Sequence, residues 1–267
     1  MVSWEFILLY LAAGSVAGLL AGLLGVGGGV VIVPMLMFIF TAQHFPVDHM
    51  IHIAIGTSLA SIMFTSLSSL RAHHSHGAVN WIIVKRITPG ILIGTLAGTF
   101  LVARLPVSLL KGFFIFFVFY VATQMLLNIR PKPARQLPGA KGMFAAGSLI
   151  GMVSSFVGIG GGALSVPFMT WSNVKMHEAI GTSAAIGFPI AVAGTIGYLI
   201  NGLEINNLPD WSLGFIHLPS LAGLVLASVI IAPLGAKAAH KLPVIILKRI
   251  FAVFLYIIGT KLLLSSL

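Results

Sequence analysis

A glycine-rich word inside an apolar run occurs twice in the 267-residue chain. The first copy reads GLLGVGGGVVIVPML and the second SSFVGIGGGALSVPFM, and each shared glycine and the proline recur 133 positions later. A second shared word follows each copy, HIAIGTSLA from residue 52 and HEAIGTSAA from residue 177. This self-similarity predicts two homologous halves, each with a glycine break inside an apolar segment.

The composition indicates the solvent in which the chain folds. Apolar residues make up 58% of the sequence and charged residues only 7%, whereas a soluble domain carries about 25% charged residues. The long apolar runs are 51–70, 91–103, 112–127, 179–200, 221–236 and 250–264. They approach the roughly 20 residues that a spanning helix needs. We therefore expect an all-α, polytopic integral membrane protein.

The chain has a formal net charge of +10, but the placement of its basic residues does not indicate nucleic-acid binding. They gather in short gaps between apolar runs, for example at Arg71, Lys85 and Arg86. This pattern is typical of topology signals and of contacts with anionic lipid headgroups. Because the chain has no cysteine, it offers no disulfide and no thiolate metal site.

The two halves divide in the same way. We expect a first transmembrane repeat at residues 1–128, a cytoplasmic linker rich in proline and basic residues at 129–141, and a second transmembrane repeat at 142–267. The spans expected after the glycine breaks are 51–70, 83–103 and 107–127 in the first repeat, and 179–200, 212–236 and 244–264 in the second.

The connection after the first of these spans differs in charge between the halves. In the first half it holds Arg71, Lys85 and Arg86, whereas its counterpart, residues 201–211, holds no Lys or Arg and two acids. Because cytoplasmic loops concentrate Lys and Arg, we expect the two connections on opposite sides of the membrane. The two repeats are therefore predicted to be inverted.

An inverted arrangement needs an odd number of crossing elements in each repeat. The apolar pieces that leave the glycines, residues 30–40 and 163–171, are too short to cross the bilayer at about 1.5 Å per residue. We therefore expect each repeat to contain a glycine-broken re-entrant helix pair plus three transmembrane helices. Both termini are then external. Arg104 and Lys111 are then external too, which disagrees with the rule that Lys and Arg concentrate in cytoplasmic loops.

The glycine breaks are the main candidates for a binding site. Irregular backbone at membrane depth is tolerated only where protein covers it or where it lines a polar cavity. The first N–H groups of the outgoing helix lack intrahelical partners, and the helix dipole adds positive potential there. These features predict an anion site without buried Lys or Arg. Helix packing is the alternative, and we favour it for Gly14, Gly18 and Gly22.

The duplicated GTS words place hydroxyl groups near each break. Thr57 and Ser58, like Thr182 and Ser183, lie early in an apolar span. Their hydroxyls can donate to anion oxygens, or they can bond back to a preceding carbonyl of their own helix. The candidate substrate-binding residues are Gly25, Gly27, Gly28, Gly29, Gly56, Thr57, Ser58, Gly158, Gly160, Gly161, Gly162, Gly181, Thr182 and Ser183.

The histidines are not our leading candidates for ligands. His52 and His177, near the start of the spans that carry the GTS words, suit the membrane interface better than a ligand role. His73, His74 and His76 cluster in a basic segment without a nearby carboxylate or thiol, which favours a solvated cytoplasmic loop over a metal site. We expect neither a metal nor a cofactor.

The acidic residues bear on what could be moved across the membrane. The five acids all lie in or near gaps between spans, whereas a proton pump or cation transporter usually carries carboxylates within its spans. Their placement favours an anion, with Glu178 as the best candidate for a proton-linked group. An inside-negative potential favours the exit of an anion by about 2.3 kcal/mol per charge and 100 mV.

The duplicated GxGGG…P words, the GTS words and the basic linker together resemble the sulfite exporter TauE/SafE family, also described as the toluene-sulfonate uptake permease family. The resemblance covers essentially the whole chain. It implies a bacterial or archaeal inner-membrane permease for a small sulfur-containing anion, such as sulfite or an organosulfonate, with export favoured by the potential. The substrate varies within the family, and thiosulfate carriers that use membrane cysteines are not matched here.

Two other functions remain open. A transporter or channel for another solute, such as a metal cation or a carboxylate, would be indicated by deep carboxylates or by Met and His ligands. An intramembrane enzyme would need a nucleophile with its base, an HExxH motif or paired intramembrane aspartates, and the sequence contains none of these. We therefore expect a transporter and not an enzyme.

Overall fold

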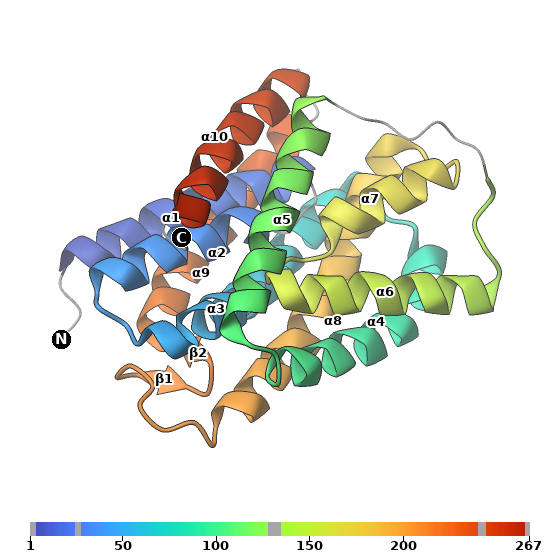
Figure 1. Ribbon diagram of the computed structural model, residues 1–267. Coiled ribbons are helices and arrows are strands. Elements are labelled where there is room, and N and C mark those ends of the chain that lie inside the picture. The colour runs from blue at the N-terminus through green and yellow to red at the C-terminus, as the bar shows by residue number, and fades with distance from the viewer. Residues whose placement is uncertain (1–3, 25–27, 128–134, 240–243, 265–267) are drawn as a thin grey trace.

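The computed structural model describes residues 4–24, 28–127, 135–239 and 244–264. These residues form ten α-helices and one short β-hairpin (Figure 1). The helices are α1 (Trp4–Leu24), α2 (Gly29–Ala42), α3 (Val47–Ser75), α4 (Trp81–Val102), α5 (Val107–Leu126), α6 (Ala140–Val157), α7 (Gly162–Trp171), α8 (Met176–Gly202), α9 (Leu218–Ala239) and α10 (Val244–Leu264). The hairpin pairs β1 (Ser212–Leu213) with β2 (Ile216–His217).

Seven of the described helices, α1, α3, α4, α5, α6, α8 and α9, are long and apolar enough to cross a membrane. The prediction of a helical, multi-pass membrane protein is confirmed. The helices that follow the glycines are short, with 14 residues in α2 and 10 in α7. Neither reaches the roughly 20 residues of a full span.

Five of the six spans predicted after the glycine breaks begin within four residues of the predicted starts. Pro46 immediately precedes α3 and Pro106 precedes α5. The side-chain oxygen of Asn80 accepts hydrogen bonds from the backbone N–H groups of Ile82 (3.1 Å) and Ile83 (3.2 Å), so that it caps the start of α4. The local sequence therefore fixes where these spans start. Residues 128–134 of the predicted linker lie outside the described residues.

The predicted start of the ninth helix at residue 212 is wrong, because the hairpin occupies the first six residues. Trp211 and Gly214 both have positive φ angles, 64° and 55°, which turn the chain instead of continuing a helix. Gly214 lies so close to the carbonyl oxygen of Leu199 that a Cβ atom would overlap it. The helix begins at Leu218.

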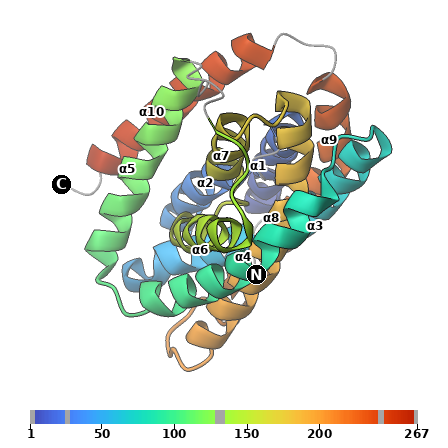
Figure 2. The same cartoon turned by 90° about the vertical axis from the view of Figure 1, so that its right-hand side faces the viewer.

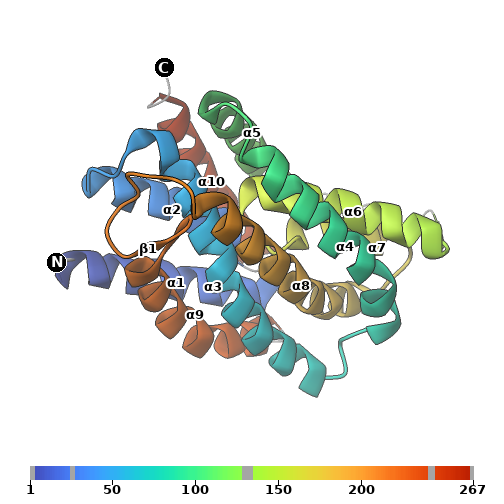
Figure 3. The same cartoon turned by 90° about the horizontal axis from the view of Figure 1, so that it is seen from below.

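Helices from the two halves pack against each other throughout the bundle. α1 lies along α9, and α6 lies along α4 (Figures 1 and 3). The pair formed by α5 and α10 lies at one side of the bundle (Figure 2). α3 contacts α8 extensively and is the most buried of the candidate spans. Neither half therefore forms a separate domain with its own core.

The two longest helices, α3 and α8, run antiparallel. Gly56, near the start of α3, lies against Tyr198, near the end of α8. Gly181, near the start of α8, lies against Ala78, which follows the end of α3. The start of each long helix is therefore beside the end of the other.

A row of glycines brings α1 and α9 into backbone contact. A Cβ atom added to Gly14, Gly18 or Gly22 would collide with main-chain atoms of α9. The carbonyl oxygens that they face belong to Leu224, Ser228 and Ala232, respectively. The packing interpretation of these three glycines is confirmed, because only a missing side chain allows this approach.

The histidine cluster is not a solvated loop, contrary to the sequence-based expectation. α3 extends to Ser75, so that His73 and His74 are helical. His73 is buried, and its Nε2 atom lies 3.2 Å from the carbonyl oxygen of Gly22 on α1. His74 and His76 are exposed. The prediction failed for His73 because the last turns of α3 pack on α1 instead of entering solvent.

We predict that Gly18→Ala lowers the stability of the purified protein by about 1–3 kcal/mol, because the new methyl group overlaps the backbone of Ser228. Gly112→Ala in α5 is the matched control, since a Cβ atom there meets nothing within 4 Å. Its effect should be neutral or slightly stabilising, because alanine favours helix over glycine. Thermal unfolding in detergent measures both variants, and equal midpoints would contradict the packing role.

Candidate functional site

The second glycine word interrupts a helix in the interior of the protein. α6 ends at Val157, and α7 begins at Gly162. Between them Gly158 and Gly161 adopt φ angles of 72° and 74°, a left-handed conformation that favours glycine. All residues from Val157 to Ala163 are buried. The predicted break is therefore present, and its backbone conformation explains why glycine recurs in the word.

The first glycine word has the same backbone geometry where the structure describes it. Gly28 has a φ angle of 72°, and α2 starts at Gly29. Both residues are buried. The candidate residues Gly25 and Gly27 lie outside the described residues. The described part thus matches Gly161 and Gly162, which occupy the same positions in the second word.

Both short helices start with buried N–H groups that find no acceptor within the described part of the chain. Leu164 and Ser165 donate to the carbonyl oxygen of Gly161, at 3.0 and 2.8 Å. Gly162 and Ala163 have no such partner, and no side chain caps the helix. The start of α2 is likewise without a side-chain cap. Unpaired N–H groups and the helix dipole make both positions attractive to negative charge.

The two breaks contact each other. Gly29 lies so close to the carbonyl oxygen of Gly158 and to the backbone of Ile159 that a Cβ atom would overlap them. Ser58 of α3 donates a hydrogen bond from its hydroxyl to the same Gly158 oxygen, at 2.8 Å. Candidate residues from both halves, Ser58, Gly29 and Gly158, therefore form one buried cluster.

Ser154 adds a polar group to this cluster that the sequence analysis missed. Its hydroxyl is fully buried and has no hydrogen-bond partner among the described residues. A Cβ atom at Gly161 would lie 3.4 Å from that oxygen, so that Ser154 borders the break. An unpaired buried hydroxyl is costly, and it can donate to a ligand here. The position that corresponds to Ser154 in the first half is Ala21. The duplicated pattern therefore did not indicate that Ser154 belongs to the site.

The threonines of the GTS words tie the two halves together. Thr57 Oγ1 accepts a hydrogen bond from the N–H of His217, at 2.9 Å. Thr182 Oγ1 accepts one from the N–H of Asn80, also at 2.9 Å. The sequence analysis considered substrate binding and back-bonding, and it missed this contact between halves. Substrate binding by Thr57 and Thr182 stays a prediction.

The glycines and the second serine of the GTS words also lie at helix contacts. Gly56 faces the carbonyl oxygen of Phe215, and Gly181 faces that of Ala78. Ser183 Oγ lies 2.9 Å from Ser165 Oγ on α7, so that it reaches the short helix of its own half. These positions hold α3 and α8 against neighbouring backbone around the breaks.

We expected His52 and His177 to lie at the membrane interface. The expectation is wrong for His52, which is buried, whereas His177 is exposed. His52 is buried, and its ring stacks on Phe215 of the hairpin with 5.2 Å between centroids. His217, in strand β2 of the hairpin, is also buried, and its Nδ1 atom lies 2.9 Å from Ser220 Oγ. Burial lowers the pKa of His217 to about 4, because the protonated ring loses solvation. This histidine is therefore neutral at physiological pH.

Glu178 lies at the start of α8 and has a defined partner. Its Oε1 atom accepts a hydrogen bond from Nδ2 of Asn80, at 2.6 Å. Asn80 thus caps α4 with its oxygen and holds Glu178 with its nitrogen. A role in proton coupling for Glu178 stays a prediction.

Comparison with known proteins gives consistent results. The family model described as sulfite exporter TauE/SafE matches residues 10–262. A protein of Haemophilus influenzae named probable membrane transporter protein is 37% identical over 264 residues, which cover 98% of this chain and 100% of the relative. A similarly named protein of Methanocaldococcus jannaschii is 25% identical, with 90% of each chain covered. No solved structure matches the chain significantly.

We predict that Thr57→Val lowers the free energy of unfolding by about 1–3 kcal/mol, because the buried N–H of His217 loses its acceptor. Thr57→Ser keeps the acceptor and serves as the matched control. Thr182→Val should cost less, since Asn80 is only partly buried and water can replace the threonine oxygen. Unfolding midpoints in detergent measure these differences, and a Thr57→Val protein as stable as Thr57→Ser would contradict the tethering role.

Proposed function

The chain belongs to the sulfite exporter TauE/SafE family and is a multi-pass membrane transporter, and we propose that it moves a small anion through the buried cluster of glycine breaks. The proposed substrate is sulfite or an organosulfonate, and export is the favoured direction. The proposed substrate ligands are the N–H groups at the starts of α2 and α7, assisted by Gly, Thr and Ser groups of both halves.

The observation that carries this proposal is the set of buried N–H groups at the starts of α2 and α7 that find no acceptor among the described residues. The two breaks contact each other through Gly29 and Gly158. In hydrocarbon such groups are costly unless something accepts their hydrogen bonds. An oxyanion supplies several acceptor oxygens and also interacts favourably with the two helix dipoles. The Ser154 hydroxyl, unpaired within the described residues, is a further donor at the same place. Such a site recognises negative charge without Lys or Arg.

We also propose that the halves are inverted repeats, related by a twofold axis in the membrane plane. The contact of Thr57 with the residue before α9 has an equal counterpart in the contact of Thr182 with the residue before α4. The antiparallel course of α3 and α8 supports inversion, because repeats related by an axis along the membrane normal would place these helices parallel. Inverted repeats with interrupted helices are a common transporter design, with the site near the midplane.

The absence of carboxylates from the described breaks supports an anion over a cation. Of the five acids in the chain, none lies in the segments around the glycines. Exit of a monoanion gains about 2.3 kcal/mol per 100 mV of an inside-negative potential, and a dianion gains twice as much. Export can therefore proceed without a coupling ion. The linker at residues 129–141 is placed in the cytoplasm in this proposal.

We predict that Gly161→Ala abolishes sulfite transport in proteoliposomes, because alanine is strained at a φ of 74° and its Cβ overlaps Ile190. Gly77→Ala is the matched control, since Gly77 has a φ of 67° but open space around it. Transport should respond to an imposed potential. Ser154→Ala, which alters the fold least, should raise the KM for sulfite about 5–10-fold by removing one donor. Wild-type transport by both Gly161→Ala and Ser154→Ala would refute the site.

We predict that cysteines introduced at Ser75 and Asn207 are labelled from opposite sides of the membrane. Both positions are exposed, one at the end of α3 and the other after the end of α8. The natural chain has no cysteine, so that the unmodified protein gives the background. A membrane-impermeant maleimide applied to intact cells and to inverted vesicles distinguishes the sides. Labelling of both cysteines from one side would exclude the inverted arrangement.

A further inference from the structure

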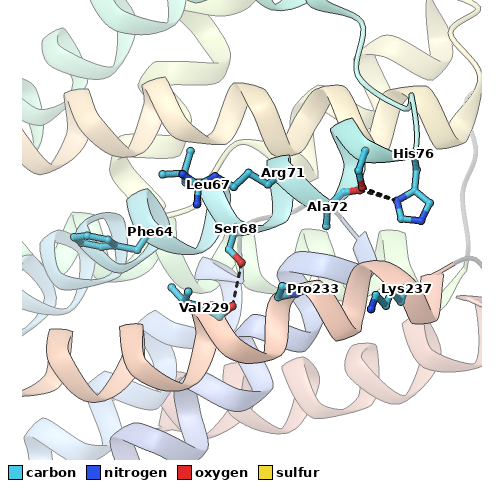
Figure 4. A pocket seen from close by; sticks show the side chains of 10 residues that line it. Phe64, Leu67, Ser68, Arg71, Ala72, His76, Val229, Pro233 and Lys237 are labelled. Atoms are coloured by element: carbon cyan, nitrogen blue, oxygen red, sulfur yellow. Dashed lines mark hydrogen bonds between the residues drawn. The ribbon is translucent and has the colours of Figure 1, made fainter.

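A pocket of about 510 Å³ lies between the second half of α3 and the second half of α9 (Figure 4), and no residue of the glycine breaks lines it. Phe64, Leu67 and Arg71 line it from α3, and Val229 and Lys237 line it from α9. Both helices belong to the seven candidate spans. The pocket is therefore a surface feature of two spanning helices.

The pocket changes from apolar to basic along its length. On α3 the lining runs from Phe64 to Arg71 in the chain direction, and on α9 it runs from Val229 to Lys237 (Figure 4). Both cations lie near the ends of their helices, and the apolar residues lie towards the helix middles. A rise of about 1.5 Å per residue places the cations roughly 10–12 Å from the apolar end. This polarity matches a phospholipid with its headgroup at the interface and its acyl chain along the helices.

Hydrogen bonds between α3 and α9 fix the floor of the pocket. Pro233 has no N–H to donate to the carbonyl oxygen of Val229 four residues earlier. The Ser68 hydroxyl of α3 donates to that oxygen instead, at 3.0 Å. The hydroxyls of Thr65 and Ser228 are 2.7 Å apart one turn away. The two helices are thus held at a set spacing, so that the pocket is a built feature of the fold.

The charge of the pocket selects its ligand. Arg71 and Lys237 are exposed, and His76 lies beside them. None of the ten lining residues is acidic. A zwitterionic headgroup such as phosphocholine has no net charge and gains little from these cations, whereas a headgroup with net negative charge is attracted.

The two cations of the pocket have no counterparts at the matching positions of the other half. By the spacing of the GTS words, Ile196 is the position in the other half that corresponds to Arg71. The sequence pair Leu-Pro occurs at 105–106 and again 137 positions later at 242–243, and by this spacing Phe100 corresponds to Lys237. Ile196 and Phe100 are both exposed apolar side chains. The two cations therefore belong to one side of the membrane only, which is expected for contact with the anionic cytoplasmic leaflet.

We propose that this pocket binds an anionic phospholipid, with its phosphodiester headgroup between Arg71 and Lys237 and an acyl chain along Phe64 and Val229. The ligand class is a phospholipid of net negative charge, such as phosphatidylglycerol. The bound lipid bridges α3 and α9, which belong to different halves, and so holds them together at their basic ends.

The test is binding of short-chain phosphatidylglycerol to the detergent-purified full chain, measured by native mass spectrometry. Phosphatidylglycerol should bind at least tenfold more tightly than phosphatidylcholine of the same chain length. The double variant Arg71→Gln/Lys237→Gln should weaken phosphatidylglycerol binding about thirtyfold, as expected for the loss of two interfacial cations. The charge-conserving variant Arg71→Lys/Lys237→Arg should retain binding and shows that the pocket still forms.

The matched control is Lys85→Gln/Arg86→Gln, which removes the same charge from exposed positions on α4 outside the pocket. It should bind phosphatidylglycerol within about twofold of the natural chain. Equal weakening by both glutamine double variants would reduce the effect to general surface charge and overturn the proposal. Equal binding of the two lipids, or displacement of phosphatidylglycerol by inorganic phosphate, would also overturn it, the latter by indicating a free-anion site.

Discussion

The structure depends on how backbone N–H groups are accommodated where a helix stops inside a membrane protein. Within a bilayer water is not there to accept their hydrogen bonds, so that an interrupted helix must be covered by protein or completed by a ligand. Here the interruptions at Gly28 and Gly161 are buried, and the two breaks touch where Gly29 meets Gly158, with the longest helices α3 and α8 beside them. The rest of the bundle serves to enclose these two helix starts.

The enclosure is made by close backbone approach and not by large side chains. Glycines on α1 bring it against the carbonyl groups of α9, and Gly56 and Gly181 do the same for α3 and α8. Each threonine that follows such a glycine then accepts a hydrogen bond from the chain segment of the opposite half. Because each of these contacts joins the two halves, together they hold one half against the other.

Local backbone features could be predicted from the sequence, whereas contacts between distant residues could not. The breaks at Gly28 and Gly161 follow from clustered glycines, and α5 and α10 begin at the predicted residues 107 and 244. The bond between Thr57 and His217 joins residues 160 positions apart, and no periodicity reports it. The hairpin that buries His52 was missed because two-residue strands give no recognisable alternation. Ser154 was missed because its side chain has no copy in the first half.

The differences between the halves are as informative as their likeness. The duplicated residues gather at the breaks and at the tethers around α3 and α8, so that duplication preserved the backbone of the proposed transport site. Some of the residues that differ, such as Arg71 opposite Ile196 and Lys237 opposite Phe100, lie on the exposed surface, whereas Ser154 opposite Ala21 is buried at a break. A protein with internal twofold symmetry still faces two different leaflets, and the surrounding lipid and solvent act only on its surface. The backbone likeness of the halves is therefore retained at the proposed anion site, whereas the surface charges of Arg71 and Lys237 have no copies in the other half.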